Sequence, residues 1–209
     1  MDTKLYSIME WLFRLVCVNF LWLLFSIPII TAIPSFYAMV SIIDKWRNET
    51  DNFSTFPEFV TEFKKYFWKS YINGFLHLVI IGVFIIDFFI LRSTGNENLV
   101  VVSYALLTLA ILFLTITFYA IPLSIKFQLK YYKILILSII IIMKQPIRSI
   151  ISITIPIFSI ALLLIQTGFG IIFLGSLTAF FMVISTNVGL KKLYGNQISI
   201  KSTVEPQSS

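Results

Sequence analysis

The segment Ser149–Leu190 reads SIISITIPIFSIALLLIQTGFGIIFLGSLTAFFMVISTNVGL, and its 42 residues include no Asp, Glu, Lys or Arg. At about 1.5 Å of rise per residue, one helix of this length would be roughly twice as long as the hydrocarbon layer of a bilayer is thick, about 30 Å. Polar residues and glycines divide the segment at Gln166–Gly170. We therefore predict two membrane-spanning helices, at about residues 149–165 and 171–190, in a multi-pass membrane protein.

The composition of the whole chain agrees with this class of protein. Hydrophobic residues make up 58% of its 209 residues and charged residues only 12%, about half the share of roughly 25% found in soluble domains. The mean hydropathy is +0.92. We treat residues 1–209 as a single integral membrane domain. The lone cysteine, Cys17, excludes a disulfide within the chain.

The distribution of basic residues predicts which segments face the cytoplasm. Lys and Arg are frequent in residues 44–71, in residues 126–148 and after residue 190. By contrast, the loop Arg92–Asn98 has one Arg and the turn at Gln166–Gly170 has none. The positive-inside rule therefore places the basic segments and the C-terminus in the cytoplasm. The uncharged blocks between them predict a further hairpin of spans, at about residues 72–91 and 99–125.

The first uncharged block, Leu15–Ile43, allows two topologies. Pro28 and Pro34 interrupt it, and neither can donate a helical hydrogen bond. A single kinked helix would leave the N-terminus outside and give five spans. A tight hairpin would give spans at about residues 11–27 and 34–46, six in total, and would leave only Arg92 outside among the 16 basic residues. We favour the hairpin.

Two cytoplasmic segments are predicted to form interfacial helices, at residues 55–70 and 127–144. In the first, Thr55 and Glu58 have the spacing of a capping box, and a stripe of phenylalanines follows at helical spacing. We expect this Phe face to lie in the acyl boundary. The second contains an apolar run of ten residues, Ile134–Met143, interrupted only by Ser138; it is too short to span and should end at Pro146. The predicted fold is therefore all-α: a polytopic transmembrane helical bundle of five or six hydrophobic helices plus two interfacial helices.

Few residues in the chain can carry catalytic chemistry. One histidine and one cysteine exclude His-rich metal sites and Cys-based zinc sites. The chain has no glycine-rich phosphate loop and no nucleophile elbow. We therefore expect no enzymatic activity, no metal and no cofactor. Membrane topology accounts for the sequence pI of about 9.4, so we expect no nucleic-acid partner.

Asp87 is the acidic residue inside an apolar run, and intramembrane ionisable groups are functional candidates by default. It lies near the end of its span, so the alternatives are a functional role, a place at the outer interface, or an ion pair with Arg92. His77 lies about 15 Å away along a helix, too far for direct contact. Asn19 is able to hydrogen-bond between helices, and packing is its expected role.

The run from Asn19 to Met39, followed by Asp44–Arg47 and the aromatic helix at 56–67, resembles the YesL-like family. These are small bacterial integral membrane proteins with a domain of unknown function. The residues that match its pattern are Asn19, Trp22, Pro28, Thr31, Pro34, Tyr37, Trp46 and Arg47. Ala32–Ile33 replaces the usual Ile-Gly before Pro34. Members are commonly encoded near carbohydrate uptake and degradation systems, and no biochemical activity follows from the resemblance.

These observations leave two main hypotheses for function. The first is an accessory or regulatory component of a carbohydrate transport system in the bacterial cytoplasmic membrane. Its partners would be the lipid bilayer and transport-system subunits, or a second copy of the chain, and the two interfacial helices would be the contact surface. The second is a small stand-alone transporter with a site near the Pro28–Pro34 break, where unwound backbone would face a cavity.

Overall fold

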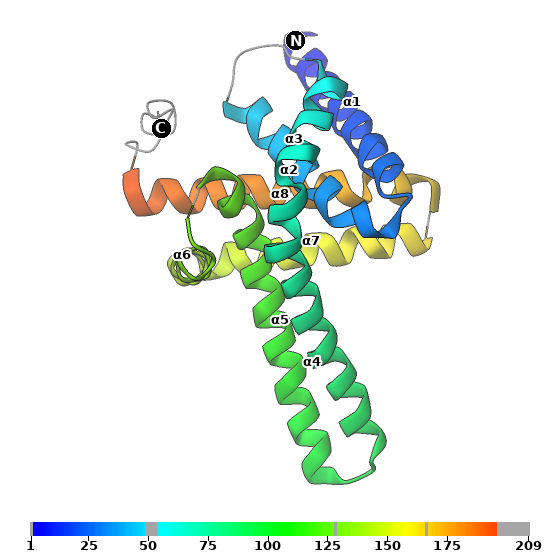
Figure 1. Ribbon diagram of the computed structural model, residues 1–209, viewed down its shortest axis with the longest axis vertical. Coiled ribbons are helices and arrows are strands. Elements are labelled where there is room, and N and C mark those ends of the chain that lie inside the picture. The colour runs from blue at the N-terminus through cyan, green and yellow to red at the C-terminus, as the bar shows by residue number, and fades with distance from the viewer. Residues whose placement is uncertain (1, 49–53, 128, 166, 196–209) are drawn as a thin grey trace.

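The computed structural model describes residues 2–48, 54–127, 129–165 and 167–195, and all its regular elements there are helical (Figure 1). The helices are α1 (Asp2–Phe25), η1 (Ile29–Thr31), α2 (Ala32–Asn48), α3 (Thr55–Ser70), η2 (Tyr71–Phe75), α4 (Leu76–Ser93), α5 (Glu97–Lys126), α6 (Tyr131–Lys144), α7 (Pro146–Ile165) and α8 (Thr167–Tyr194). The prediction of an all-α membrane protein is confirmed.

Within the described residues, three stretches are long and apolar enough to cross a membrane: Ile8–Phe25, Thr55–Ser93 and Glu97–Lys126. The number of spans, five or six, stays a prediction.

Helices α1 and α2 run antiparallel. At the turn, the Trp22 indole donates a hydrogen bond of 3.4 Å to the carbonyl of Ala32. At the far end, the rings of Trp11 and Trp46 meet edge to face, with centroids 6.2 Å apart. The chain therefore reverses at the short helix η1, as the hairpin alternative requires. Pro34 does not break α2, because it lies in the first turn, where a helical N–H has no partner within the helix.

Helix α3 returns along α2 and continues into α4 through η2, a five-residue π-helix. Gly74 in this segment lies against α2, since a methyl group there would be 2.7 Å from Ile33 Cγ2. Helices α4 and α5 then form a long hairpin that projects from the rest of the molecule (Figure 1). The amide of Asn98 bonds the side chain of Asn96 at 3.0 Å and starts α5.

Helices α7 and α8 pack against each other and cross the direction of the α4–α5 hairpin (Figure 1). Helix α6 ends at Lys144, before Pro146, and α7 leaves it at an angle of 108°. The turn predicted at Gln166–Gly170 is shorter than expected: Thr167–Gly170 already belongs to α8, and Gln166 lies outside the described residues.

The core lies where α2 meets α1, α3, α5 and α8. Its largest fully buried side chains include Tyr37, Met39, Phe59 and Tyr119. Helix α2 is the most enclosed element, with almost every residue from Pro34 to Ile43 buried. The segment predicted as the span 34–46 is thus packed inside protein along its described length, while α4 and α5 carry the large exposed apolar faces.

Candidate functional site

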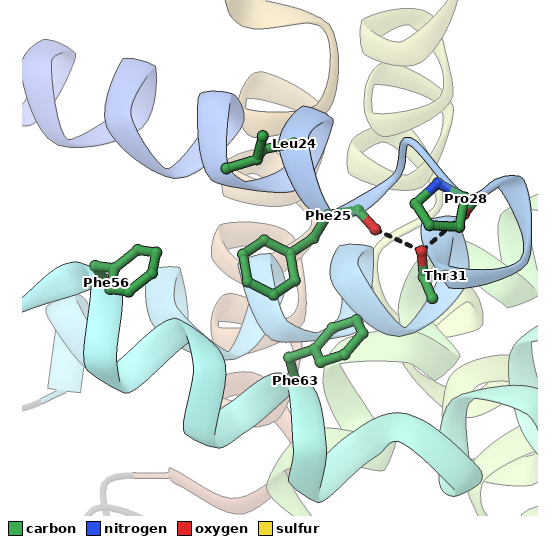
Figure 2. Close-up of a pocket in the computed structure, with 6 residues that line it drawn as sticks. All are labelled: Leu24, Phe25, Pro28, Thr31, Phe56 and Phe63. Carbon is green, nitrogen blue, oxygen red and sulfur yellow. Dashed lines mark hydrogen bonds between the residues drawn. The ribbon is translucent and has the colours of Figure 1, made fainter.

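An open apolar hollow of about 430 Å³ lies at the break between α1 and α2 (Figure 2). Its lining residues are Leu24, Phe25, Pro28, Thr31, Phe56 and Phe63. Two of the residues singled out in the sequence, Pro28 and Thr31, therefore meet here. Thr31 is the one polar side chain in this lining, and its hydroxyl donates to the backbone carbonyls of Phe25 and Pro28. The hydroxyl proton is therefore used within the turn and is not available to donate to a ligand.

Hydroxyl groups hold the rest of this turn as well. Ser26 at the end of α1 bonds Ser35 of α2, with 2.8 Å between the two oxygens. The Tyr71 hydroxyl donates to the carbonyl of Ile30 from the π-helix. These bonds satisfy backbone and side-chain groups that the proline-rich turn leaves without helical partners. The turn therefore keeps its shape without the glycine that the YesL-like pattern has before Pro34.

The phenylalanines of α3 pack against protein and not only against lipid, which corrects the expected position of this helix. The ring of Phe25 on α1 lies 5.3 Å from that of Phe59 and 5.2 Å from that of Phe63. Phe59 is fully buried. The apolar stripe of α3 is therefore largely covered by α1 and α2, and among the aromatic side chains of α3 only Phe56 and Trp68 are exposed.

The predicted capping box at the start of α3 is also wrong. Ser54 is the N-cap residue, and its side chain makes no capping hydrogen bond. Thr55 is already inside the helix, so its hydroxyl is out of register for a cap. Glu58 instead pairs with Lys45 across the α2–α3 interface. The spacing of Thr55 and Glu58 fits a capping box, but the Glu58 carboxylate forms an ion pair with Lys45 of α2 instead of capping α3.

Glu62 is the central polar residue of this interface, and the sequence analysis did not single it out. Its side chain is only 2% exposed. The Ser41 hydroxyl donates to it at 2.6 Å, Lys45 at 2.9 Å, and Lys65 at 3.2 Å. A buried carboxylate is costly unless it is paired and hydrogen-bonded, and these three donors provide both. The spacing of Phe59, Glu62 and Tyr66 on one helical face was the signal that could have revealed it.

A second polar contact joins α2, α5 and α8 beside the first. Asp44 pairs with Lys126 at 2.8 Å, and both side chains are largely buried. The Asn187 amide donates to the same carboxylate at 3.5 Å. On α3, the Lys69 ammonium donates to the carbonyl of Ser124 at 2.6 Å. A cation at the C-terminal turn of a helix offsets its negative dipole end, so Lys69 and Lys126 both anchor the end of α5.

Asn19 makes a packing contact between α1 and α8. It is buried, and its side-chain oxygen accepts hydrogen bonds from the backbone amides of Gly175 and Ser176, both at 3.1 Å. Gly175 of α8 lies directly against the α1–α2 hairpin, since a methyl group there would be 2.7 Å from the Trp22 ring. Asn19 thus hydrogen-bonds the backbone of α8 at a point where α1 and α8 are so close that position 175 has room only for glycine.

Trp46, Arg47 and Asp87, the remaining singled-out residues, lie apart from the hollow. Trp46 is buried, with the Arg14 guanidinium 5.8 Å from its ring centre, and Arg47 is exposed. Asp87 is partly exposed on the projecting hairpin. No ion pair joins Asp87 to Arg92 among the described residues. Arg92 lies over the Phe88 ring, 5.9 Å from its centre.

His77 is fully buried beside the π-helix. Its Nδ1 atom faces the Asn73 carbonyl, which can only accept, so Nδ1 carries the proton. The Tyr131 hydroxyl of α6 lies between the two ring nitrogens, 3.3 Å from Nδ1 and 3.2 Å from Nε2, and with the proton on Nδ1 it is Nε2 that can accept from it. The ring thus joins the start of α4 to α6.

The polar side chains described above bond mainly to other parts of the same chain. Glu62 and Asp44 connect helices, Asn19 connects α1 to α8, and His77 connects α4 to α6. Within the described residues, no three His, Cys, Asp or Glu side chains are grouped so that they could hold a metal. The fold and this arrangement define a helical membrane protein with a polar, internally bonded framework.

Comparison with known proteins finds similarity to a family of unknown function and to two uncharacterized proteins. Residues 15–88 match the model of a family described as "Protein of unknown function, DUF624". The chain is 29% identical to the uncharacterized protein YteU of Bacillus subtilis over 58% of its own length, and the match spans about half, 55%, of that relative. It is 24% identical to the uncharacterized protein YesL of the same organism over 80% of each chain. No solved structure matches it significantly. These matches confirm the resemblance to the YesL-like family, whose function is unknown.

Proposed function

We propose that the protein is an accessory or regulatory component of a membrane complex, without catalytic activity of its own. The observation that carries the proposal is the use of the buried polar groups: Glu62, Asp44 and Asn19 all hold the chain to itself. Such a framework stabilises a fixed shape that presents surfaces to other proteins. The association with a carbohydrate transport system in the bacterial cytoplasmic membrane, with a cytoplasmic C-terminus, rests on the resemblance and on the basic segments.

The exposed side of α3 is the contact surface that we propose for a transport subunit. Lys64 and Trp68 lie one turn apart there, both exposed, with no ion pair to Lys64 among the described residues. Lys65 is unsuitable for testing this surface because it binds the buried Glu62. Trp is among the residues most enriched in the hot spots of protein interfaces.

Co-purification from native membranes in mild detergent tests this role. We expect a permease or ATPase subunit in stoichiometric amount with the wild-type chain, and its loss with Trp68→Ala/Lys64→Glu. Tyr132→Ala/Lys133→Glu on α6 is the matched control, because both residues are also exposed. Recovery of the chain alone from every membrane preparation would contradict the proposal.

A stand-alone transporter is the second candidate, because a hollow does lie at the Pro28–Pro34 break. Its lining suits an apolar compound, since the Thr31 hydroxyl is already bonded to backbone. Uptake of a solute by the purified protein in liposomes, abolished by Phe63→Trp in the hollow, would favour this candidate over the accessory role.

A further inference from the structure

The second half of the chain has an unusual charge distribution. From Asn98 to Val204 the sequence contains no Asp or Glu, but it contains eight basic residues: Lys126, Lys130, Lys133, Lys144, Arg148, Lys191, Lys192 and Lys201. Among those that the structure describes, Lys126 is paired with Asp44. The other six described cations are exposed and form no ion pair with a described residue.

Four of these cations gather at the corner between α6 and α7. Lys144 and Arg148 stand on either side of the corner residue Gln145. Helix α8 lies directly against it, because Gln145 Nε2 donates to the Ser185 carbonyl at 3.0 Å. A methyl group at Gly189 would be 2.5 Å from Ile141 Cγ2, so the helices touch closely here.

Lys191 and Lys192 follow Gly189 within one helical turn, which brings them beside the same corner. Figure 1 shows the end of α8 lying next to α6 and the start of α7. The cationic corner, as we name Lys144, Arg148, Lys191 and Lys192, is therefore built from three helices.

Exposed apolar side chains adjoin the cationic corner. Met143 is 76% exposed and Ile147 is 75% exposed, and each is next to one of the cations in the chain. A ligand that satisfies this surface needs an anionic group attached to an apolar body. A small anion would leave the apolar side chains in water, whereas a lipid covers them with its acyl chains.

The other basic segment of the molecule shows why topology alone does not explain this corner. At the α2–α3 interface, Lys45 and Lys65 are neutralised by Glu58 and Glu62. The lysines of a basic segment can thus be neutralised by carboxylates of the same chain. At the cationic corner, the described part of the chain supplies no such carboxylate, so the counter-charge has to come from outside it.

We propose that the cationic corner binds the headgroup of an anionic phospholipid, with the acyl chains along Met143 and Ile147. Arg148 matches a phosphate oxygen pair through its planar fork, and the three lysines act as point charges. Each basic residue near an anionic surface is expected to strengthen binding about fivefold. The bound lipid would fix the end of α8 against the α6–α7 corner.

Lipid titration of the delipidated full-length chain in neutral detergent tests the proposal, with thermal unfolding and native mass spectrometry as readouts. We expect phosphatidylglycerol to raise the unfolding temperature and phosphatidylcholine to leave it unchanged. The variants Lys144→Gln/Arg148→Gln and Lys191→Gln/Lys192→Gln should each need at least tenfold more phosphatidylglycerol. Lys130→Gln/Lys133→Gln, which removes two exposed cations before and at the start of α6, far from the corner, should behave as wild type.

Three results would overturn the proposal. Equal stabilisation by phosphatidylcholine would show that only the acyl chains are recognised. An equal loss of binding in Lys130→Gln/Lys133→Gln would show that only net charge matters. Stabilisation by inorganic phosphate that removes the phosphatidylglycerol effect would identify a free-anion site. Because all six substituted side chains are exposed, the unfolding temperature without lipid should stay at its wild-type value in each variant, which separates lost binding from lost folding.

Discussion

The hydroxyl of Ser41 on α2 donates a 2.6 Å hydrogen bond to the carboxylate of Glu62 on α3, inside the most enclosed part of the fold. Lys45, one turn further along α2, holds the other oxygen of the same carboxylate. An acidic side chain of an amphipathic helix thus points into the protein, where two residues of the neighbouring helix receive it. This contact fixes the rotation of α3 about its axis and with it the direction in which α4 leaves.

Glu62→Gln should lower the free energy of unfolding in micelles by about 1–3 kcal/mol, because it leaves Lys45 and Lys65 with less counter-charge in a buried site. Glu58→Gln should cost less, since Glu58 is 28% exposed and Lys45 keeps Glu62 as its partner. Thermal or denaturant unfolding of both variants measures this order. A larger loss for Glu58→Gln would show that Glu62 is not the centre of the network.

Gly175→Ala should destabilise the protein by about 1–3 kcal/mol, because the added methyl group would lie 2.7 Å from the Trp22 ring and 2.9 Å from Met39 Cε. Gly82→Ala is the matched control. Nothing lies within 4 Å of a methyl group at Gly82, so this change should be neutral or stabilise α4 by up to about 1 kcal/mol. Similar unfolding temperatures for the two variants would refute the close packing of α8 on α1 and α2.

Tyr131→Phe should cost about 1 kcal/mol of stability, because it removes the hydroxyl that donates to the buried His77 Nε2 atom. Tyr132→Phe, at the exposed neighbouring position, should change stability by less than about 0.5 kcal/mol. Unfolding curves of the two variants, recorded side by side, provide the comparison. If both prove silent, α6 is not anchored through His77.

Asp87→Asn should insert normally and change stability by less than about 0.5 kcal/mol, because Asp87 is partly exposed and forms no ion pair with Arg92. The test is the yield and unfolding temperature of the variant, with the Glu62→Gln variant as a sensitive reference. Loss of an identified transport activity without loss of folding would instead establish Asp87 as a functional residue.

The α1–α2 hairpin makes a prediction about topology. In a Cys17→Ala background, a cysteine at Tyr6 should resist an impermeant thiol reagent in intact cells, whereas a cysteine at Asn96 should react. Both positions are exposed in the structure, so burial does not explain a difference. Labelling after permeabilisation serves as the control for reactivity. Labelling of both positions in intact cells would place the N-terminus outside.

The sequence by itself determined the class of the protein and the approximate position of its helices. Hydropathy and helical periodicity are local properties, because each residue contributes to them whatever it later contacts. The uncharged segments therefore predicted membrane helices, and Pro28–Pro34 and Pro146 predicted breaks near the places where the chain turns. The polar turn after Ile165 was predicted for the same reason, although its length was overestimated.

Only the tertiary structure decided how those helices face one another. Helical spacing puts Glu62 on the same face of α3 as Phe59 and Tyr66, but its partners Ser41 and Lys45 come from α2. Asp44 and Lys126, far apart in sequence, meet because α2 and α5 cross at their ends. Each of these contacts depends on the rotation and register of two packed helices, and no local pattern encodes either. For the same reason, the stripe of α3 that periodicity assigned to lipid lies against α1 and α2.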